Sequence, residues 1–159
     1  MLDHVSIRVS DYTRSKGFYL AAFKPLGYDL VMEVSSEETG GHSEAGFGSK
    51  GRPYFWIGGG KPHKGRAHFA FMAKNRAAVD AFYAAALKAG GKDNGKPGLR
   101  PHYHADYYGA FVLDPDGHNI EAVCRLPEQT SGSEGEYHTQ KIESQRLLAQ
   151  SPASKLSEG

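Results

Sequence analysis

The order of hydrophobic and polar residues predicts a strand followed by a helix at the start of the chain. Residues 3–9 alternate, as in a strand that buries one face. The apolar face of that strand carries Val5, Ile7 and Val9, and the opposite face carries His4, Ser6 and Arg8. Asp11 can cap the helix that follows, and Pro25 and Gly27 can end it. The apolar stripe of this helix consists of Phe18, Tyr19, Ala22 and Phe23.

The second half of the sequence predicts the same order of elements. The pattern at 67–73 predicts a strand, Asn75 can cap the helix after it, and Gly90-Gly91 can end that helix. Short strands are predicted near 28–35, 43–48 and 53–58 in the first half, and near 92–96, 109–113 and 119–124 in the second. Residues 114–117 (DPDG) predict a tight turn between the last two of these strands.

Shifting the sequence by 64 positions aligns residues 4–27 with 68–91 with seven identities. The matched pairs are His4/His68, Phe18/Phe82, Tyr19/Tyr83, Ala21/Ala85, Ala22/Ala86, Lys24/Lys88 and Gly27/Gly91. A match of this kind in one ungapped offset indicates an internal repeat. We therefore predict an α+β fold of two tandem βαβββ modules, 1–63 and 64–127.

The composition of the chain changes after Pro127. Residues 128–140 are rich in Ser, Gly, Glu, Gln and Thr, which is typical of a linker. We predict that residues 1–127 form the domain and that 128–159 form a polar tail. A weak apolar stripe predicts a short helix near 140–150, packed on the domain or on a partner subunit.

Composition and charge narrow the functional classes. The net charge of +1 gives no basic field for nucleic acid or anionic membranes, and no apolar run approaches the roughly 20 residues of a membrane span. The N-terminus lacks the basic-then-apolar order of a secretory signal. The single cysteine, Cys124, excludes an internal disulfide and has apolar neighbours. We therefore expect a buried thiol in a cytoplasmic protein with a small-molecule or protein partner.

The polar faces of three predicted strands carry potential metal ligands. His4 and His68 are equivalent in the repeat, and strand parity places both on the face opposite the helices. Glu121 lies in an apolar strand, where an unpaired carboxylate would be costly to bury. Two imidazoles and one carboxylate can hold Ni, Mn, Zn or Fe and leave positions open for a substrate. We therefore predict one divalent metal, bound by His4, His68 and Glu121. The strands of the two modules would then form a curled mixed sheet around a metal-binding cleft.

The other histidines are weaker candidates as metal ligands. His102 and His104 form an H-x-H pair, but residues 100–108 are aromatic and contain Pro101, which is typical of a loop. Structural or substrate-contact roles suit this pair better. The remaining histidines lie in turn-like or polar stretches, where we expect solvated side chains: His42, His63, His118 and His138.

Four motifs resemble the vicinal oxygen chelate superfamily, which includes glyoxalase I, fosfomycin-resistance thiol transferases, methylmalonyl-CoA epimerase, extradiol dioxygenases and bleomycin-resistance proteins. They are HVSIRVSD at 4–11, GFYLAAFKPLGY at 17–28, HFAF at 68–71 and DPDGHNIEAV at 114–123. The resemblance covers residues 1–127 and implies that His4, His68 and Glu121 are metal ligands. It also implies that Arg8 binds an anionic group, such as a carboxylate of glutathione. The alternative for Arg8 is an ion pair with an acidic residue of the chain.

The sequence departs from glyoxalase I in one respect. That enzyme has a second glutamate on the last strand of its first module, where it serves as metal ligand and catalytic base. The repeat offset maps Glu121 onto Ile57, and residues 53–60 (PYFWIGGG) contain no carboxylate. The missing base argues against glyoxalase I activity. The remaining ligand set is closer to those of the thiol transferases and dioxygenases.

Aromatic residues supply the rest of the predicted site. We expect Trp56 to contact the substrate, and Tyr103, His104 and Tyr107 to provide acid–base or orienting groups from a covering loop.

The predicted function is a metal-dependent, glyoxalase-like enzyme that chelates two neighbouring substrate oxygens. Its chemistry would be that of a lyase or isomerase, a dioxygenase, or a transferase with glutathione or another thiol as cosubstrate. We expect a homodimer whose cleft is completed across subunits. The alternatives are a metal-free binding protein of the bleomycin-resistance kind and a scaffold that uses its tail for interaction.

Overall fold

The computed structural model describes residues 2–62 and 64–128, so the helix predicted near 140–150 lies outside the described residues. Contacts group Met1–Leu126 into one compact unit. The elements of the first half are β1 (Val5–Val9), α1 (Tyr12–Phe23), η1 (Lys24–Leu26), β2 (Asp29–Val34), α2 (Ser36–Thr39), β3 (Glu44–Ser49) and β4 (Arg52–Gly59). Those of the second half are β5 (His68–Met72), α3 (Arg76–Lys88), β6 (Lys92–Leu99), β7 (Tyr108–Leu113) and β8 (Asn119–Cys124).

The strands form two four-stranded mixed sheets with the same topology. Their orders are β1-β4-β3-β2 and β5-β8-β7-β6, and in each sheet the first pair is parallel and the others are antiparallel. This confirms the predicted α+β fold of two βαβββ modules. The sheets are separate and do not close into a barrel, so β1 and β5 are edge strands.

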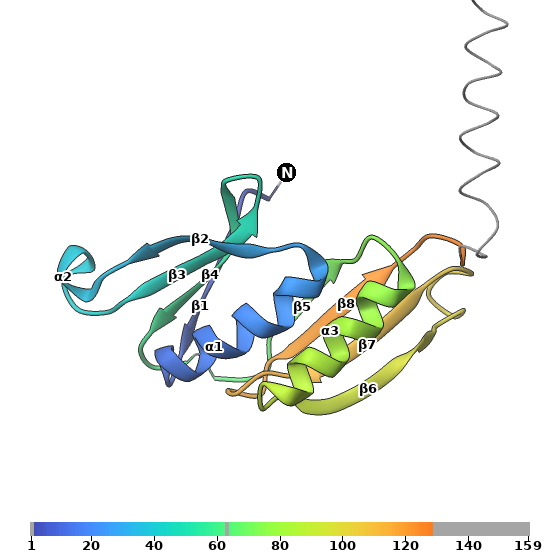
Figure 1. Ribbon diagram of the computed structural model, residues 1–159. Helices are drawn as coiled ribbons and strands as arrows, with labels where there is room; N and C mark the ends of the chain where they lie inside the picture. Colours follow the sequence, from blue (N-terminus) through green and yellow to red (C-terminus); the bar gives the residue numbers. More distant parts are fainter. Residues whose placement is uncertain (1, 63, 129–159) are drawn as a thin grey trace, which may run out of the picture. The chain divides into compact units, whose positions relative to one another are not determined.

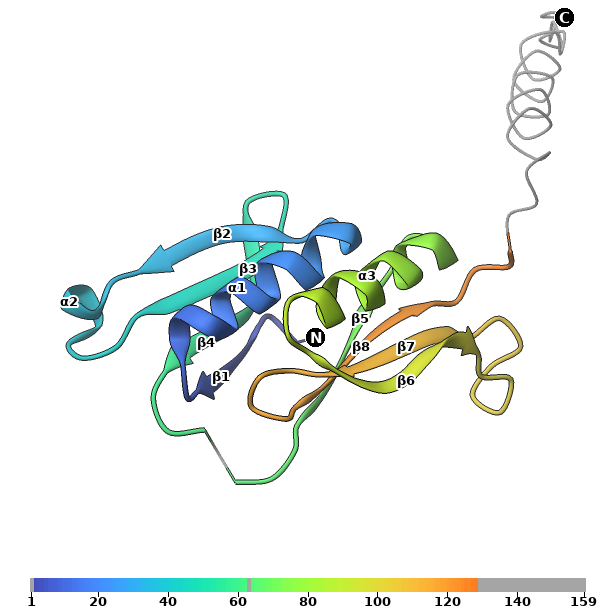
Figure 2. The ribbon, with the colours of Figure 1, turned by 60° about the horizontal axis from the view of Figure 1, so that its bottom comes forward.

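The two long helices begin at the predicted caps. The Asp11 carboxylate accepts a hydrogen bond from the Arg14 N–H (2.9 Å), and Asn75 Oδ1 accepts one from the Ala78 N–H (2.8 Å). Each helix packs on the sheet of its own module, and α1 and α3 lie side by side (Figures 1 and 2). None of the helices in the described part of the chain is long and apolar enough to cross a membrane.

One hydrophobic core joins the two modules. The burial of β1 alternates as predicted, with Ile7 and Val9 inside and Ser6 and Arg8 outside. Aromatic rings of the two modules meet at the centre, where Phe71 lies 4.6 Å from Phe23 and 5.4 Å from Phe55 between ring centroids. Cys124 is buried, as expected from its neighbours. Burial of these rings on both sides of the junction favours folding of residues 2–126 as one unit.

The turn between β7 and β8 also links the modules. The Tyr19 hydroxyl on α1 donates to Asp114 Oδ2 over 2.6 Å, and both side chains are buried. Asp114 Oδ1 accepts from the backbone N–H groups of Asp116 and His118. The Asp116 carboxylate in turn accepts from the backbone N–H of Ser10 at 3.0 Å. Burial and the facing Asp114 carboxylate raise the pKa of Tyr19 well above its ordinary value.

The prediction of a solvated His118 was wrong. Its side chain is 1% exposed, and its Nδ1 accepts a hydrogen bond from the Ala67 N–H at 3.1 Å. The turn sequence before it indicated exposure, but the imidazole lies beneath the segment that leads into β5. His42 is half-buried rather than solvated, because its ring lies against Glu44. His63 and His138 lie outside the described residues.

Candidate functional site

Glu121 is the centre of a polar cluster in the second module. Its side chain is 2% exposed, although it lies in the otherwise apolar β8. The Tyr107 hydroxyl donates to Glu121 Oε1 over 2.5 Å, and His68 Nε2 lies 2.9 Å from Glu121 Oε2. Both oxygens of the buried carboxylate therefore have partners, which offsets the cost of its desolvation.

The surroundings of Tyr107 favour its neutral form. Burial raises its pKa to about 12, and the hydrogen bond to Glu121 and the charge of that carboxylate add to the effect. The Arg125 guanidinium lies 5.3 Å from the centre of the Tyr107 ring, and the Tyr103 ring packs edge-on at 5.2 Å. At neutral pH Tyr107 keeps its proton and acts as a hydrogen-bond donor.

Glycine makes room for this cluster on the adjacent strand. A Cβ added to Gly109 of β7 would lie 3.1 Å from Glu121 Oε1 and 3.2 Å from Cε1 of Tyr107. These distances are tighter than ordinary contacts, so a larger residue at Gly109 would press on the tyrosine–carboxylate pair.

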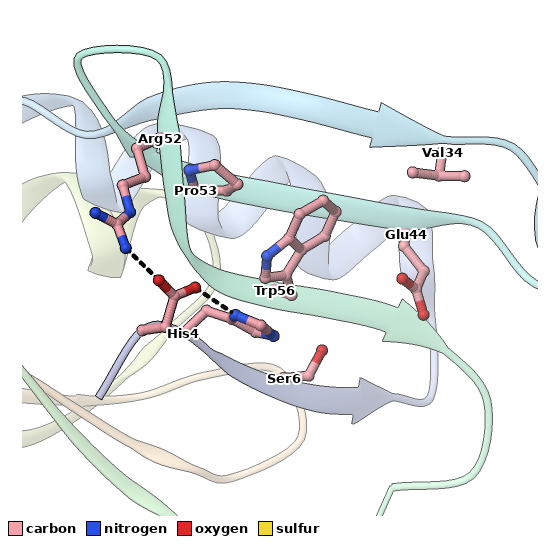
Figure 3. A pocket seen from close by; sticks show the side chains of 8 residues that line it. His4, Ser6, Val34, Glu44, Arg52, Pro53 and Trp56 are labelled. Carbon is pink, nitrogen blue, oxygen red and sulfur yellow. Dashed lines mark hydrogen bonds and ion pairs between the residues drawn. The ribbon is translucent and has the colours of Figure 1, made fainter. Parts of the chain in front are cut away.

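His4 lies in a different environment, on the first module. Its Nδ1 is 2.9 Å from Asp3 Oδ1, and Asp3 also pairs with Arg52. Hydrogen bonds from His4 and Arg52 lower the pKa of the Asp3 carboxyl. Figure 3 shows His4 in an open pocket of about 360 Å³ on the face of the sheet opposite α1. Its lining residues are Asp3, His4, Ser6, Val34, Glu44, Arg52, Pro53 and Trp56.

Arg8 lies on the same face of the first sheet. Its guanidinium is 3.3 Å from Glu44 Oε1, which His42 Nε2 also approaches to 2.9 Å. The alternative expected for Arg8, a pair with an acidic residue, is therefore present in the structure. Its side chain is still 44% exposed, so an anionic ligand could also reach the guanidinium. Glu44 was not among the residues predicted for the site, although its position at the start of β3 brings it to this face.

The structure brings together only part of the predicted site. His68, Glu121, Tyr107 and Tyr103 form one cluster, whereas His4 and Trp56 line the pocket of the other module. Within residues 2–62 and 64–128, no group of three or more His, Cys, Asp or Glu side chains is placed to hold a metal ion.

His104 does not join either cluster. Its Nδ1 accepts a hydrogen bond from the Asp106 N–H at 3.1 Å, within its own loop. The acid–base role expected for His104 stays a prediction, and so does the three-ligand metal site.

His68 and Glu121 together supply two of the donor atoms that a metal site requires. Imidazole nitrogen and carboxylate oxygen bind divalent metals at about 2.0–2.2 Å, which places neighbouring donor atoms about 3 Å apart. The observed separation of 2.9 Å fits that requirement. Tyr107 holds the other carboxylate oxygen, as the outer partners of metal ligands commonly do.

The strand register corrects the residue assigned as the counterpart of Glu121. Glu121 pairs with Ala70, two residues after His68, whereas Trp56 pairs with Ser6, two residues after His4. The residue of the first module that is equivalent to Glu121 is therefore Trp56 and not Ile57. The segment between the first and last strands is one residue longer in the second module than in the first. Neither position carries a carboxylate, so the departure from glyoxalase I remains.

The fold and the site define a protein class of two repeated βαβββ modules with a histidine–carboxylate pair on the face of one sheet opposite its helix. The chain belongs to the Glyoxalase/Bleomycin resistance protein/Dioxygenase superfamily, whose family model matches residues 1–122. This confirms the family that the sequence motifs resemble.

Solved structures show the same fold. A glyoxalase/bleomycin resistance protein from Albidiferax ferrireducens T118 is 28% identical, with a TM-score of 0.57 over 76% of this chain and 95% of that one. A glyoxalase/bleomycin resistance protein/dioxygenase family enzyme from Burkholderia phytofirmans PsJN is 20% identical, with a TM-score of 0.59 over 79% and 98%. The trypanothione-dependent glyoxalase I of Leishmania major is 18% identical, with a TM-score of 0.54 over 92% and 98%. No curated protein matches the sequence significantly.

Proposed function

We propose that this protein is a metal-dependent enzyme that binds a small molecule through two neighbouring oxygens. The observation that carries the proposal is the buried Glu121 carboxylate, held by Tyr107 and lying 2.9 Å from His68. When bound, a divalent metal would supply a Lewis acid that polarises substrate oxygens and stabilises developing negative charge. A cytoplasmic setting accords with the single, free Cys124.

The residues of the chain have distinct roles in this proposal. Glu121 and His68 would hold the metal, and Tyr107 fixes the carboxylate by donating a hydrogen bond to Oε1. Because its pKa is raised to about 12, Tyr107 orients and donates rather than acting as a base. Arg8 would release part of its pairing with Glu44 to hold an anionic group of the substrate or of a thiol cosubstrate.

We further propose that a second copy of the chain completes the site. His4 lies on the first module, outside the cluster that contains His68 and Glu121. The exposed side of each sheet and the edge strands β1 and β5 are available for a partner in the described part of the chain. A symmetric dimer would bring the first module of one chain to the second module of the other, and would do so twice.

Metal content tests both parts of the proposal. The variants His4→Ala and Glu121→Gln are dialysed, loaded with Ni, Mn, Zn or Fe, and compared with the wild type by elemental analysis. We expect about one metal per wild-type chain and little in either variant. The two variants are then unfolded, mixed and refolded together. If the site is shared, about a quarter of the wild-type metal content returns, because half of the dimers are mixed and each has one intact site.

The outcomes separate the possible arrangements. A site built within one chain would give no recovery on mixing, because every chain lacks a ligand. Absence of metal from the wild type under all loading conditions would overturn the enzyme proposal.

A metal-free binding protein is the second candidate function. Glu121 is already satisfied by Tyr107 and His68, so its burial does not by itself require a metal. Under this alternative the Glu121→Gln variant would bind small molecules as well as the wild type does, and neither would contain metal. Calorimetry on the two proteins would show this.

A further inference from the structure

A second pocket lies on the helix side of the first sheet. Its volume is about 140 Å³, and its wall includes Phe23, the last residue of α1. Phe71 of β5 also lines it, so both modules contribute to this pocket. All of its lining residues are aromatic, and they define what we call the aromatic pocket: Phe23, Tyr28, Phe47, Tyr54, Phe55 and Phe71.

A β-bulge in the first sheet directs Tyr54 into the aromatic pocket. Phe47 of β3 pairs with Phe55 of β4. The next pair along these strands is Gly48 with Pro53, so Tyr54 has no partner on β3. In a regular strand Tyr54 and Phe55 would lie on opposite faces of the sheet, but here both line the same pocket.

Gly48 allows the two strands to approach closely at this bulge. A Cβ added to Gly48 would overlap the carbonyl oxygen of Arg52, so no larger residue fits here without a shift of the backbone. The bulge interrupts the regular pairing of β3 with β4. Bulges commonly redirect a side chain toward a site, and the side chain redirected here is that of Tyr54.

The floor of the aromatic pocket is apolar and its mouth carries two phenol groups. Phe23, Phe47 and Phe55 are at most 1% exposed, whereas Tyr54 is 36% exposed. Burial raises the pKa of Tyr28, and the neighbouring Tyr54 adds to this effect, so the two phenols lie near each other. In the described part of the chain, neither hydroxyl has a hydrogen-bond partner and no charged side chain lines the pocket.

The size and the lining of the pocket select its ligand. An apolar cavity of roughly 150 Å³ can bind a molecule the size of benzene, and the aromatic pocket has nearly this volume. The ring of Phe71 meets Phe55 edge to face at 5.4 Å and Tyr28 at 6.0 Å between centroids. A further aromatic ring would extend this arrangement and make dispersion contacts with the lining rings. A charged molecule would lose its hydration without gaining an ion pair.

We infer that the aromatic pocket binds an uncharged molecule with a single aromatic ring, whose polar substituent lies at the Tyr28 and Tyr54 hydroxyls. This site is separate from the proposed metal site, because neither His68 nor Glu121 is among its lining residues. A ligand bound here contacts both modules and therefore stabilises the folded protein.

Three probes with the same ring test the inference. Toluene is apolar, para-cresol adds one hydroxyl, and benzoate carries a charge. Calorimetry on the metal-free protein measures their affinities, and thermal unfolding measures the change in Tm. Nuclear Overhauser effects between bound toluene and isotope-labelled phenylalanine rings locate the ligand directly, without any substitution in the core.

We expect toluene and para-cresol to bind and to raise the Tm, and benzoate to do neither. Bound toluene should give Overhauser effects to Phe23, Phe47 and Phe71. Tyr54→Phe removes a hydroxyl and keeps the ring, so it should weaken para-cresol by about threefold to tenfold and leave toluene unchanged. Tyr103→Phe is the matched control and should change neither affinity, because Tyr103 is exposed and does not line the pocket.

Two variants extend the test to the wall and to the second phenol. Tyr54→Leu removes one aromatic wall and should weaken toluene by about twofold to tenfold. Tyr28→Phe should act as Tyr54→Phe does, since both hydroxyls lie at the mouth.

Several results would overturn the inference. One is a folded wild-type protein that binds neither toluene nor para-cresol, and another is benzoate that binds as tightly as toluene. Overhauser effects to Trp56 in place of the three phenylalanines would put the ring in the pocket that His4 lines, and would also overturn it. Because all measurements use metal-free protein, a failure to find metal would overturn the proposed function and leave this inference standing.

Discussion

Replacing Tyr107 by phenylalanine removes one hydroxyl from the Glu121 cluster and keeps the ring. The hydroxyl donates to Glu121 Oε1 over 2.5 Å, and the carboxylate is 2% exposed. After the change, His68 is the one side chain in the described part of the chain that still pairs with Glu121. The variant therefore measures what the tyrosine contributes to holding a buried charge.

The charge on the acceptor gives the size of the effect. A hydrogen bond to a charged group contributes roughly 1.5–3 kcal/mol to stability. Burial is the first cause of the raised pKa of Tyr107 and the hydrogen bond to Glu121 is the second, so the pKa supports the direction of the effect. We expect Tyr107→Phe to lower the free energy of unfolding by about 2 kcal/mol at neutral pH.

Urea unfolding measures this difference, followed by circular dichroism and by Trp56 fluorescence at one protein concentration. Tyr103→Phe is the control, since Tyr103 is 63% exposed and should change stability by less than about 0.5 kcal/mol. If Tyr107→Phe also stayed within that limit, the hydrogen bond to Glu121 could not be holding the carboxylate.

The pH dependence gives a second check on the same pair. The pKa of Tyr107 is higher in the folded protein than in the unfolded chain, so its contribution to stability is fully present below about pH 10. It is lost as the pH rises from about 10 to about 12. The stability difference between wild type and Tyr107→Phe should therefore shrink over this interval. A difference that grew with pH would contradict the raised pKa.

Three further substitutions test the packing. Tyr19→Phe should lower the unfolding free energy by roughly 1.5–3 kcal/mol in urea, because it removes the 2.6 Å hydrogen bond to the buried Asp114. Gly91→Ala should cost about 1–3 kcal/mol in thermal unfolding, since its Cβ would lie 2.5 Å from Val112 Cγ1. Gly17→Ala should instead stabilise the protein by about 0.5–1 kcal/mol, because Gly17 lies within α1 with nothing near its Cβ position. A destabilised Gly17→Ala would contradict the assigned helix.

The fold could be predicted from the sequence wherever a local rule governs it. Alternation in residues 3–9 and the caps Asp11 and Asn75 act within a few residues, and all are found in the structure. The short helix α2 was missed although Ser35 and Glu38 form a capping box, a pattern that is visible in the sequence. It lies between Gly- and Ser-rich turns, where a four-residue helix has no hydrophobic period to reveal it.

The site could be predicted only in part, because its contacts depend on register and long-range packing. The burial of Glu121 followed from its apolar neighbours, but its hydrogen bond to Tyr107 joins a loop to a strand across the cluster. The equivalence of Trp56 with Glu121 required the pairing of whole strands, since the repeat offset changes by one residue within a module. The burial of His118 could not be inferred from a turn sequence that is typical of the surface.

The two modules carry different residues at equivalent positions, and this difference affects how the proposed site would work. In the second module a histidine, His68, begins the first strand, and in the first module His4 directly precedes it. The last strands of the two modules differ at one pair of equivalent positions. The second module has Glu121 there, which can bind a metal together with His68, and the first module has Trp56, which cannot. Two copies of the second module would give two metal pairs, and two copies of the first would give none. A dimer that brings one face of each kind together would place the His68–Glu121 pair opposite the pocket that His4 lines. In this arrangement, loss of Glu121 would remove the metal, whereas loss of Trp56 would leave it bound.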